Sequence, residues 1–261
     1  MTTEHDLGKE SVGKGKVAVV TGASAGIGAA TVVALAQAGY TVFGGARRRE
    51  PLEKICGAVG AFAHVLDVAD AESVARFAAW LEEKAGALHV LVNNAGFAAG
   101  VDAVSQADVD AWRSMYETNV LGVVRLTQVL LPRLEASGDG HVINVGSIAG
   151  FETYPGGGGY TATKHALRAA TRTLRIELLG RPVRVTEICP GMVETEFSVV
   201  RLGDEEKADA VYQGMQPLVA QDIAETIRWC STRPSHVNID EIVVRPRDQA
   251  TATAVYRREQ D

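Results

Sequence analysis

Short apolar runs rich in β-branched residues alternate along this chain with longer segments of helical periodicity. Nearly continuous hydrophobicity within each run is typical of parallel strands buried on both faces. An alternation of strands and helices predicts a parallel sheet covered by helices, so we expect an α/β fold with a doubly wound, seven-stranded parallel sheet and helices on both faces. The runs are Lys16–Val20, Tyr40–Gly45, Ala61–Leu66, His89–Asn93, His141–Ser147, Val183–Ile188 and Glu241–Val244.

The length of 261 residues is within the range of one large α/β domain. We expect this domain to span residues 15–248, because the ends, 1–14 and 249–261, are polar, lack periodicity and resemble tails. The segment 190–216 interrupts the regular pattern after the sixth strand. A loop of this length inside a compact domain is typically a lid or a binding element.

Charge and composition exclude several classes of function. A net charge of -6 offers no basic surface for nucleic acid, and no run approaches the eighteen apolar residues that a membrane span needs. The first fifteen residues lack the apolar stretch of a signal peptide. The three cysteines are scattered without metal-ligand spacing, so we expect no metal site and a reducing, cytoplasmic location.

A glycine-rich turn follows the first predicted strand. Gly22, Gly26 and Gly28 have the spacing G-x-x-x-G-x-G, which differs from the G-x-G-x-x-G dinucleotide fingerprint. Glycine allows a sharp bend and close approach to a diphosphate at the N-terminus of the next helix. The turn alone is equally compatible with a tight strand-to-helix connection. Its position favours dinucleotide binding, because a second strand ends about twenty residues later.

The end of that second strand carries three consecutive arginines. Arg47 and Arg48 offer guanidinium groups suited to a 2′-phosphate, which favours NADP(H) over NAD(H). The alternative is a solvated helix start. Glu50 precedes Pro51 and suits a helix entry better than a ribose contact.

Tyr160 follows Ser147 by thirteen residues, and Lys164 follows Tyr160 by four. On a helix this spacing puts a phenol and an ammonium on one face, where the cation can lower the pKa of the phenol from about 10. Two solvated helix positions would show the same pattern. Together with the glycine turn, the pair indicates an enzyme that moves a hydride and a proton between a nicotinamide cofactor and a small-molecule alcohol or carbonyl.

With these motifs the chain resembles the short-chain dehydrogenase/reductase family over about residues 15–247, which implies a single Rossmann-type domain. Many members carry serine where Gly146 stands, a departure that we expect to matter little. The matching motifs are Thr21–Gly28, Leu66–Val68, Asn93–Gly96, Asn119 in Thr-Asn-Val, Ser147 in Gly-Ser-Ile-Ala-Gly, Tyr160 with Lys164, and Pro190-Gly191 followed by Thr195.

The resemblance implies a catalytic tetrad of Asn119, Ser147, Tyr160 and Lys164. Tyr160 would be the acid in reduction and the base in oxidation, and Ser147 would hydrogen-bond the substrate oxygen. Lys164 would bind the nicotinamide ribose, and Asn119 would hold a water that relays protons to it. Ser147 at a strand end and Asn119 in a helix could otherwise be local hydrogen-bonding residues.

The resemblance also implies a set of cofactor contacts. Asp67 would accept from the adenine amino group, although a strand-end turn residue would look the same. The full set is Gly22, Ser24, Gly26, Ile27, Gly28, Arg47, Arg48, Asp67, Val68, Asn94, Ala95, Gly96, Tyr160, Lys164, Pro190, Gly191, Val193 and Thr195.

Pocket residues after Gly96, before Tyr160 and in the lid favour an apolar or modestly polar carbonyl, although any of them could be core. Arg201 is the one lid cation that could meet a carboxylate, but the acidic residues around it favour a solvated charge. The pocket candidates are Phe97, Phe151, Tyr154, Met192 and Phe197.

Two C-terminal stretches, 221–227 and 240–249, resemble the subgroup of clavulanic acid dehydrogenase and the NADP-dependent 3-hydroxy acid (serine) dehydrogenases. This resemblance implies a 3-hydroxy acid or similar alcohol as substrate. A different reading is a catalytically silent nucleotide sensor or scaffold of the same fold. The family resemblance further implies a homodimer or homotetramer, with Val120, Val123, Val124 and Leu167 compatible with the interface.

Overall fold

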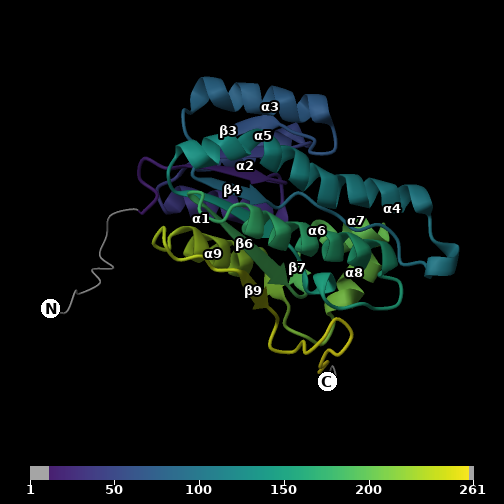
Figure 1. Ribbon diagram of the computed structural model, residues 1–261. Helices are drawn as coiled ribbons and strands as arrows, with labels where there is room; N and C mark the ends of the chain where they lie inside the picture. Colours follow the sequence, from purple (N-terminus) through teal and green to yellow (C-terminus); the bar gives the residue numbers. More distant parts are fainter. Residues whose placement is uncertain (1–11, 259–261) are drawn as a thin grey trace.

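The computed structural model describes residues 12–258 (Figure 1). One sheet of seven parallel strands has the order β3-β2-β1-β4-β5-β6-β9 and confirms the predicted sheet. The predicted strand ends differ from the observed ones by at most two residues, because pairing with neighbours decides where a strand stops. The strands are β1 (Val17–Thr21), β2 (Thr41–Ala46), β3 (Phe62–Val65), β4 (Val90–Asn93), β5 (Gly140–Val145), β6 (Val183–Pro190) and β9 (Glu241–Val244).

Helices cover both faces of the sheet, as the hydrophobic pattern predicts. On one face α1 (Gly26–Gln37), α2 (Arg49–Ala58) and α9 (Ala220–Ser231) contribute Leu35, Leu52 and Ile227 to one apolar core. A second core forms on the other face under α3 (Ala71–Lys84), α5 (Gly122–Ala136) and α6 (Gly158–Glu177). Shorter elements join these layers: η1 (Val104–Gln106), α4 (Val109–Tyr116), the π-helical turn η2 (Glu117–Leu121) and η3 (Ile148–Gly150).

The strand order creates the place for a ligand. β1 lies between β2 and β4, so successive connections leave the sheet centre in opposite directions. A crevice forms at the carboxyl ends of the strands at such a switch point. Gly22 follows β1, Asn94 follows β4 and Ser147 lies just beyond β5, so the sheet brings these three motifs to one edge.

The segment 190–216 is more regular than we predicted. It contains α7 (Glu196–Leu202) and α8 (Glu205–Tyr212), and β7 (Val193–Glu194) pairs with β8 (Leu218–Val219) just beyond it. The side chains of Thr195 and Asp204 accept hydrogen bonds from the backbone amides of Phe197 and Lys207. These N-caps start the two short helices and correct the expectation of an irregular segment.

The C-terminal residues also differ from the expected tail. Gln249 is only 5% exposed, and its side chain accepts a hydrogen bond from the Met192 amide at 2.9 Å. Asp248 accepts two hydrogen bonds from Arg258, so the end of the described chain folds back beside the lid (Figure 1). Polar sequence is compatible with packing here because the polar groups satisfy one another. Residues 1–11 and 259–261 of the expected tails lie outside the described residues, whereas 12–14 form part of a turn in which the Gly13 amide donates to the Ala38 carbonyl at 2.9 Å.

Three of the four residues expected at a subunit interface lie inside the subunit. Val120, Val123 and Leu167 are buried, whereas Val124 is 37% exposed. Of these four, only Val124 can meet a partner without a rearrangement. Among residues 12–258, none of the helices combines the length and the apolar character that a bilayer crossing needs.

Candidate active site

The glycine turn holds the N-terminus of α1 open toward the sheet edge. Gly22 and Gly26 have φ of 65° and 51°, in the left-handed region that favours glycine. A side chain on Gly28 would overlap the Gly22 carbonyl and the Asn94 side chain. No side chain caps the start of α1 at Ala25, so its first N–H groups are available to an anion.

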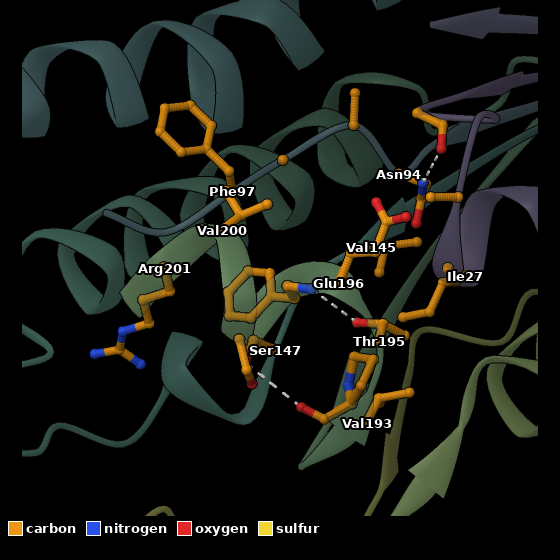
Figure 2. Close-up of a pocket in the computed structure, with 18 of the residues that line it drawn as sticks. Ile27, Asn94, Phe97, Val145, Ser147, Val193, Thr195, Glu196, Val200 and Arg201 are labelled. Carbon is orange, nitrogen blue, oxygen red and sulfur yellow. Dashed lines mark hydrogen bonds between the residues drawn. The ribbon is translucent and has the colours of Figure 1, made fainter. Parts of the chain in front are cut away.

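A pocket of about 580 Å³ opens over this turn and extends under the lid. In Figure 2, Ile27 and Asn94 lie on one side of it and Arg201 on the other. Gly28 and Asn119 are absent from its wall, whereas the other expected site residues contribute to it. Those residues are Gly22, Ser24, Gly26, Ile27, Arg47, Arg48, Asp67, Val68, Asn94, Ala95, Gly96, Ser147, Tyr160, Lys164, Pro190, Gly191, Val193 and Thr195.

Two arginines stand at the end of the pocket where we expect the nucleotide, directly after β2. Arg47 and Arg48 are exposed, and Arg48 donates to the Glu196 carboxylate of the lid at 2.8 Å. Asp67 accepts a hydrogen bond from the Ala69 amide at 3.0 Å, which is the local turn that its alternative reading predicts. That turn still leaves Asp67 on the pocket wall.

Ser147, Tyr160 and Lys164 share another part of the wall. Ser147 caps η3 by accepting from the Ala149 amide at 3.1 Å, and its hydroxyl donates to the Pro190 carbonyl at 3.4 Å. Lys164 follows Tyr160 by one helical turn, with its Nζ 5.7 Å from the centre of the phenol ring. The same Nζ donates to the Val145 carbonyl at 2.8 Å, so the sheet edge fixes the lysine.

Burial shifts the pKa values of Tyr160 and Lys164 so that the neutral form of each side chain is favoured. It raises the pKa of the Tyr160 phenol above its ordinary value, while a hydrogen bond with Ser147 acts in the opposite direction. It lowers the pKa of Lys164 to about 8, against the negative charge of Glu187. The pKa of Tyr160 is therefore not lowered in this structure, because burial outweighs the Ser147 hydrogen bond and the positive charge of Arg201. That Lys164 lowers it stays a prediction.

Asn119 lies behind the pocket, in the π-helical turn η2. Its side-chain amide donates to the Phe97 carbonyl at 2.8 Å and to Thr163 Oγ1 at 3.1 Å, and its oxygen accepts from the Phe97 amide at 3.0 Å. The amide thus fastens the segment after β4 to helix α6. π-Helical turns recur at functional sites. Here the turn brings Asn119 to Thr163, which precedes Lys164 in the sequence.

The end of the pocket where we expect the substrate is rich in aromatic residues. Phe97, Tyr154, Met192 and Phe197 line it as expected, and the Phe197 ring lies 5.3 Å from that of Tyr160. Phe151 is absent from the wall; its ring instead packs under the guanidinium of Arg168 at 4.7 Å.

Arg201 corrects our expectation of a solvated charge. It is half-buried at the substrate end, where it donates to the Tyr154 hydroxyl at 3.1 Å and to the Gly156 carbonyl at 3.0 Å. No carboxylate within residues 12–258 pairs with it. Helix α7 turns this side chain inward, away from the acidic residues that are its neighbours in sequence, and local charge counting could not show that.

Two further wall residues come from the end of the chain. Gln249 and Ala252 reach the pocket because the C-terminal segment folds back against the lid. The sequence predicts that both belong to the polar tail 249–261. Nothing in their local sequence distinguishes them from solvated residues, so only the folded structure reveals them.

The family model for the short chain dehydrogenases matches residues 16–206. The chain belongs to the short chain dehydrogenase family. This membership confirms the resemblance and the expectation of an oxidoreductase, because the matched region covers most of the chain and includes the glycine turn, Ser147, Tyr160 and Lys164.

The similarity to known proteins covers nearly the whole chain. An uncharacterized oxidoreductase of Mycobacterium tuberculosis is 56% identical over 91% of this chain and 94% of its own. The NADP-dependent 3-hydroxy acid dehydrogenase of Schizosaccharomyces pombe is 41% identical over 94% of this chain and 98% of its own. The closed form of serine dehydrogenase complexed with NADP+ has a TM-score of 0.88 and 38% identity, covering 93% of this chain and 100% of that one.

Proposed function

We propose that this dehydrogenase interconverts an alcohol and a carbonyl with NADP(H), using Tyr160 as the acid or base. One observation carries the proposal: Ser147, Tyr160 and Lys164 meet on the wall of the pocket that the glycine turn opens. A group that exchanges a proton with the substrate oxygen and a site for a dinucleotide therefore face the same space.

The side chains divide the work of reduction. Bound NADPH supplies the hydride. The raised pKa of Tyr160 keeps its phenol protonated, so the hydroxyl can give its proton to the oxygen of the carbonyl. Ser147 offers a second donor to that oxygen. Lys164, protonated below pH about 8, contributes positive charge and binds ribose hydroxyls.

Asn119 would act indirectly in this scheme. Since its side-chain amide is occupied by Phe97 and Thr163, the proposed proton-relay water would bind near η2 through another polar group of this turn.

We assign cofactor preference to Arg47 and Arg48 at the nucleotide end. Their guanidinium groups match a 2′-phosphate, and two similar proteins are named for NADP. Replacing both with alanine should raise the KM for NADPH far more than that for NADH. Arg49→Ala is the matched control, because Arg49 is exposed outside the pocket wall. Equal changes for both cofactors would assign the arginines to surface charge.

We assign the substrate class to Arg201. A cation without a carboxylate partner at the substrate end suits a substrate with its own carboxylate, such as a 3-hydroxy acid. The relatives named for 3-hydroxy acid and serine dehydrogenation support this class. The aromatic wall suits a small apolar substituent on that substrate.

The direct experiment supplies the purified protein with NADP(H) and a panel of 3-hydroxy acids, their oxo counterparts, and uncharged aldehydes and ketones. Turnover should be highest for the carboxylates. Cofactor binding seen by fluorescence, with no hydride transfer to any member of the panel, would instead support a nucleotide sensor.

A cytoplasmic location and a dimer or tetramer stay predictions. Three free, buried cysteines support the reducing compartment. Sedimentation measures the oligomer directly, and a monomer at working concentration would contradict that prediction.

A further inference from the structure

A buried carboxyl group lies just outside the pocket wall. Glu187, on β6, is 1% exposed, and neither of its side-chain oxygens has a hydrogen-bond partner within residues 12–258. An unpaired buried carboxylate is costly to a fold, so its retention calls for a compensating charge nearby.

The structure places that carboxyl beside the Lys164 anchor. Strands β5 and β6 pair so that Val145 faces Ile188, and the Gly146 amide donates to the Ile188 carbonyl at 2.8 Å. Lys164 donates to Val145. A side chain on Gly146 would overlap a Glu187 carboxyl oxygen and lie 3.0 Å from its Cγ. The glycine that departs from the family pattern is therefore the residue that makes space for Glu187.

Other charged and titratable groups near Glu187 are already engaged or weakly polar. Glu241, on β9, accepts from Arg168 Nε and Nη2 at 3.0 Å each, and Arg172 adds a third contact. The Cys189 thiol lies in the same cluster. Because both Glu241 oxygens are held by Arg168, only Glu187 and Cys189 of this cluster in the described part of the chain remain as ligands, too few for a metal site. Among residues 12–258, two cations act on Glu187, and of these Arg168 is already held by Glu241 whereas Lys164 pairs with no carboxylate.

We propose that Glu187 is a positioning residue for Lys164: the Glu187 carboxylate is the counter-charge of the Lys164 ammonium. Residue 146 is glycine because this carboxylate occupies the space that a side chain there would need. The proposal rests on the proposed function, in which Lys164 acts as an ammonium. It adds a residue that touches neither cofactor nor substrate.

The electrostatics agree with this geometry. Burial lowers the pKa of Lys164, and the negative charge of Glu187 is the first opposing influence. On balance the pKa of Glu187 is raised: burial and the charge of Glu241 raise it, while Lys164, Arg168 and the Cys189 thiol lower it. Each member of the pair therefore favours the charged form of the other. Loss of the carboxylate should let Lys164 become neutral at a lower pH.

The test measures the pKa of Lys164 directly. Protein labelled with carbon-13 at lysine Cε gives a simple spectrum, since the chain has seven lysines, and Lys164→Arg identifies the resonance. In Glu187→Gln we expect the pKa of Lys164 to fall by about one pH unit. Glu177→Gln removes an exposed carboxylate from the end of α6 and should leave it unchanged. An identical Lys164 pKa in the wild type and Glu187→Gln would overturn the proposal.

Glu187→Asp serves if the glutamine variant does not fold. Aspartate withdraws the carboxylate from Lys164 by one methylene, so a smaller shift in the same direction is expected, and no shift contradicts the proposal. In the kinetic readout, the falling alkaline limb of kcat for reduction should move to lower pH in Glu187→Gln by the same amount. A protein with a merely structural Glu187 would lose activity equally at every pH.

A double-mutant cycle tests the part played by Gly146. Gly146→Ala should lower the Tm of the wild type and lower it less in a Glu187→Ala background, because the competing carboxyl is gone. If the losses of Tm in the two single variants add up in the double variant, Gly146 and Glu187 do not compete for space, and that part of the proposal is wrong. The NMR titration needs neither cofactor nor substrate, so a shifted Lys164 in a protein without turnover would refute only the proposed function.

Discussion

The two ends of the pocket are built in different ways. At the nucleotide end, Gly22 and Ile27 come from one short segment that runs from the end of β1 into the first turn of α1, and they act through backbone shape and open N–H groups. At the substrate end, Phe97, Arg201 and Gln249 come from three segments that are far apart in sequence, and they act through side chains. Backbone geometry at the nucleotide end suits a ligand that many proteins of this fold share. Side chains at the substrate end can change without disturbing the sheet.

The largest effect is expected where the two ends meet. Tyr160→Phe removes the proton donor and should lower kcat by about 10²- to 10⁴-fold while NADPH binding stays within error. Steady-state kinetics and fluorescence titration measure the two quantities. Tyr154→Phe is a control on the same wall and should keep most of kcat. A normal kcat for Tyr160→Phe would remove the acid or base role.

Arg201→Met tests the substrate end alone. Loss of a charged hydrogen bond of about 1.5–3 kcal/mol predicts a rise in KM of about 10- to 150-fold for carboxylate substrates. Uncharged carbonyls provide the internal control and should show little change in KM, as should NADPH. A parallel loss for charged and uncharged substrates would mean that Arg201 only supports Tyr154 and the lid.

Gly28→Ala tests the nucleotide end alone. The new methyl group would overlap Gly22 and Asn94, and crowding of this kind costs about 1–3 kcal/mol. We expect a lower Tm and weaker NADPH binding. Gly57→Ala, with open space around the new methyl group, should lower neither. Normal cofactor affinity in Gly28→Ala would show that the turn tolerates more than its geometry indicates.

The smallest effect couples both ends through pH. Since the pKa of Lys164 is about 8 and that of Tyr160 is raised, the lysine should lose its proton first as pH rises. Reduction should therefore be about half-maximal near pH 8 and fall further above it, with Tyr160 still protonated. A pH profile of kcat at saturating NADPH checks this. If kcat instead falls near the ordinary pKa of a tyrosine, the proton of Tyr160 controls the pH dependence.

Prediction of position in the fold succeeded where one segment contains the whole signal. The turn at Gly22–Gly28 and the pair Tyr160 and Lys164 each lie within a few residues, so strand and helix periods place them without knowledge of the rest. Arg201 was assigned wrongly because nearby acidic residues suggested a wet surface, whereas α7 turns its side chain toward Tyr154. Gln249 was assigned to a tail because its partner, Met192, is 57 residues away.

The sequence by itself determined the parallel sheet, the nucleotide turn and the order of the reactive groups, since these depend on local periodicity and on glycine. Only the tertiary structure decided which distant side chains share the pocket. It also gave Gly146 a reason, because Glu187 on the neighbouring strand occupies the space that a side chain would need. Contacts between strands depend on sheet register and packing, which no single segment specifies.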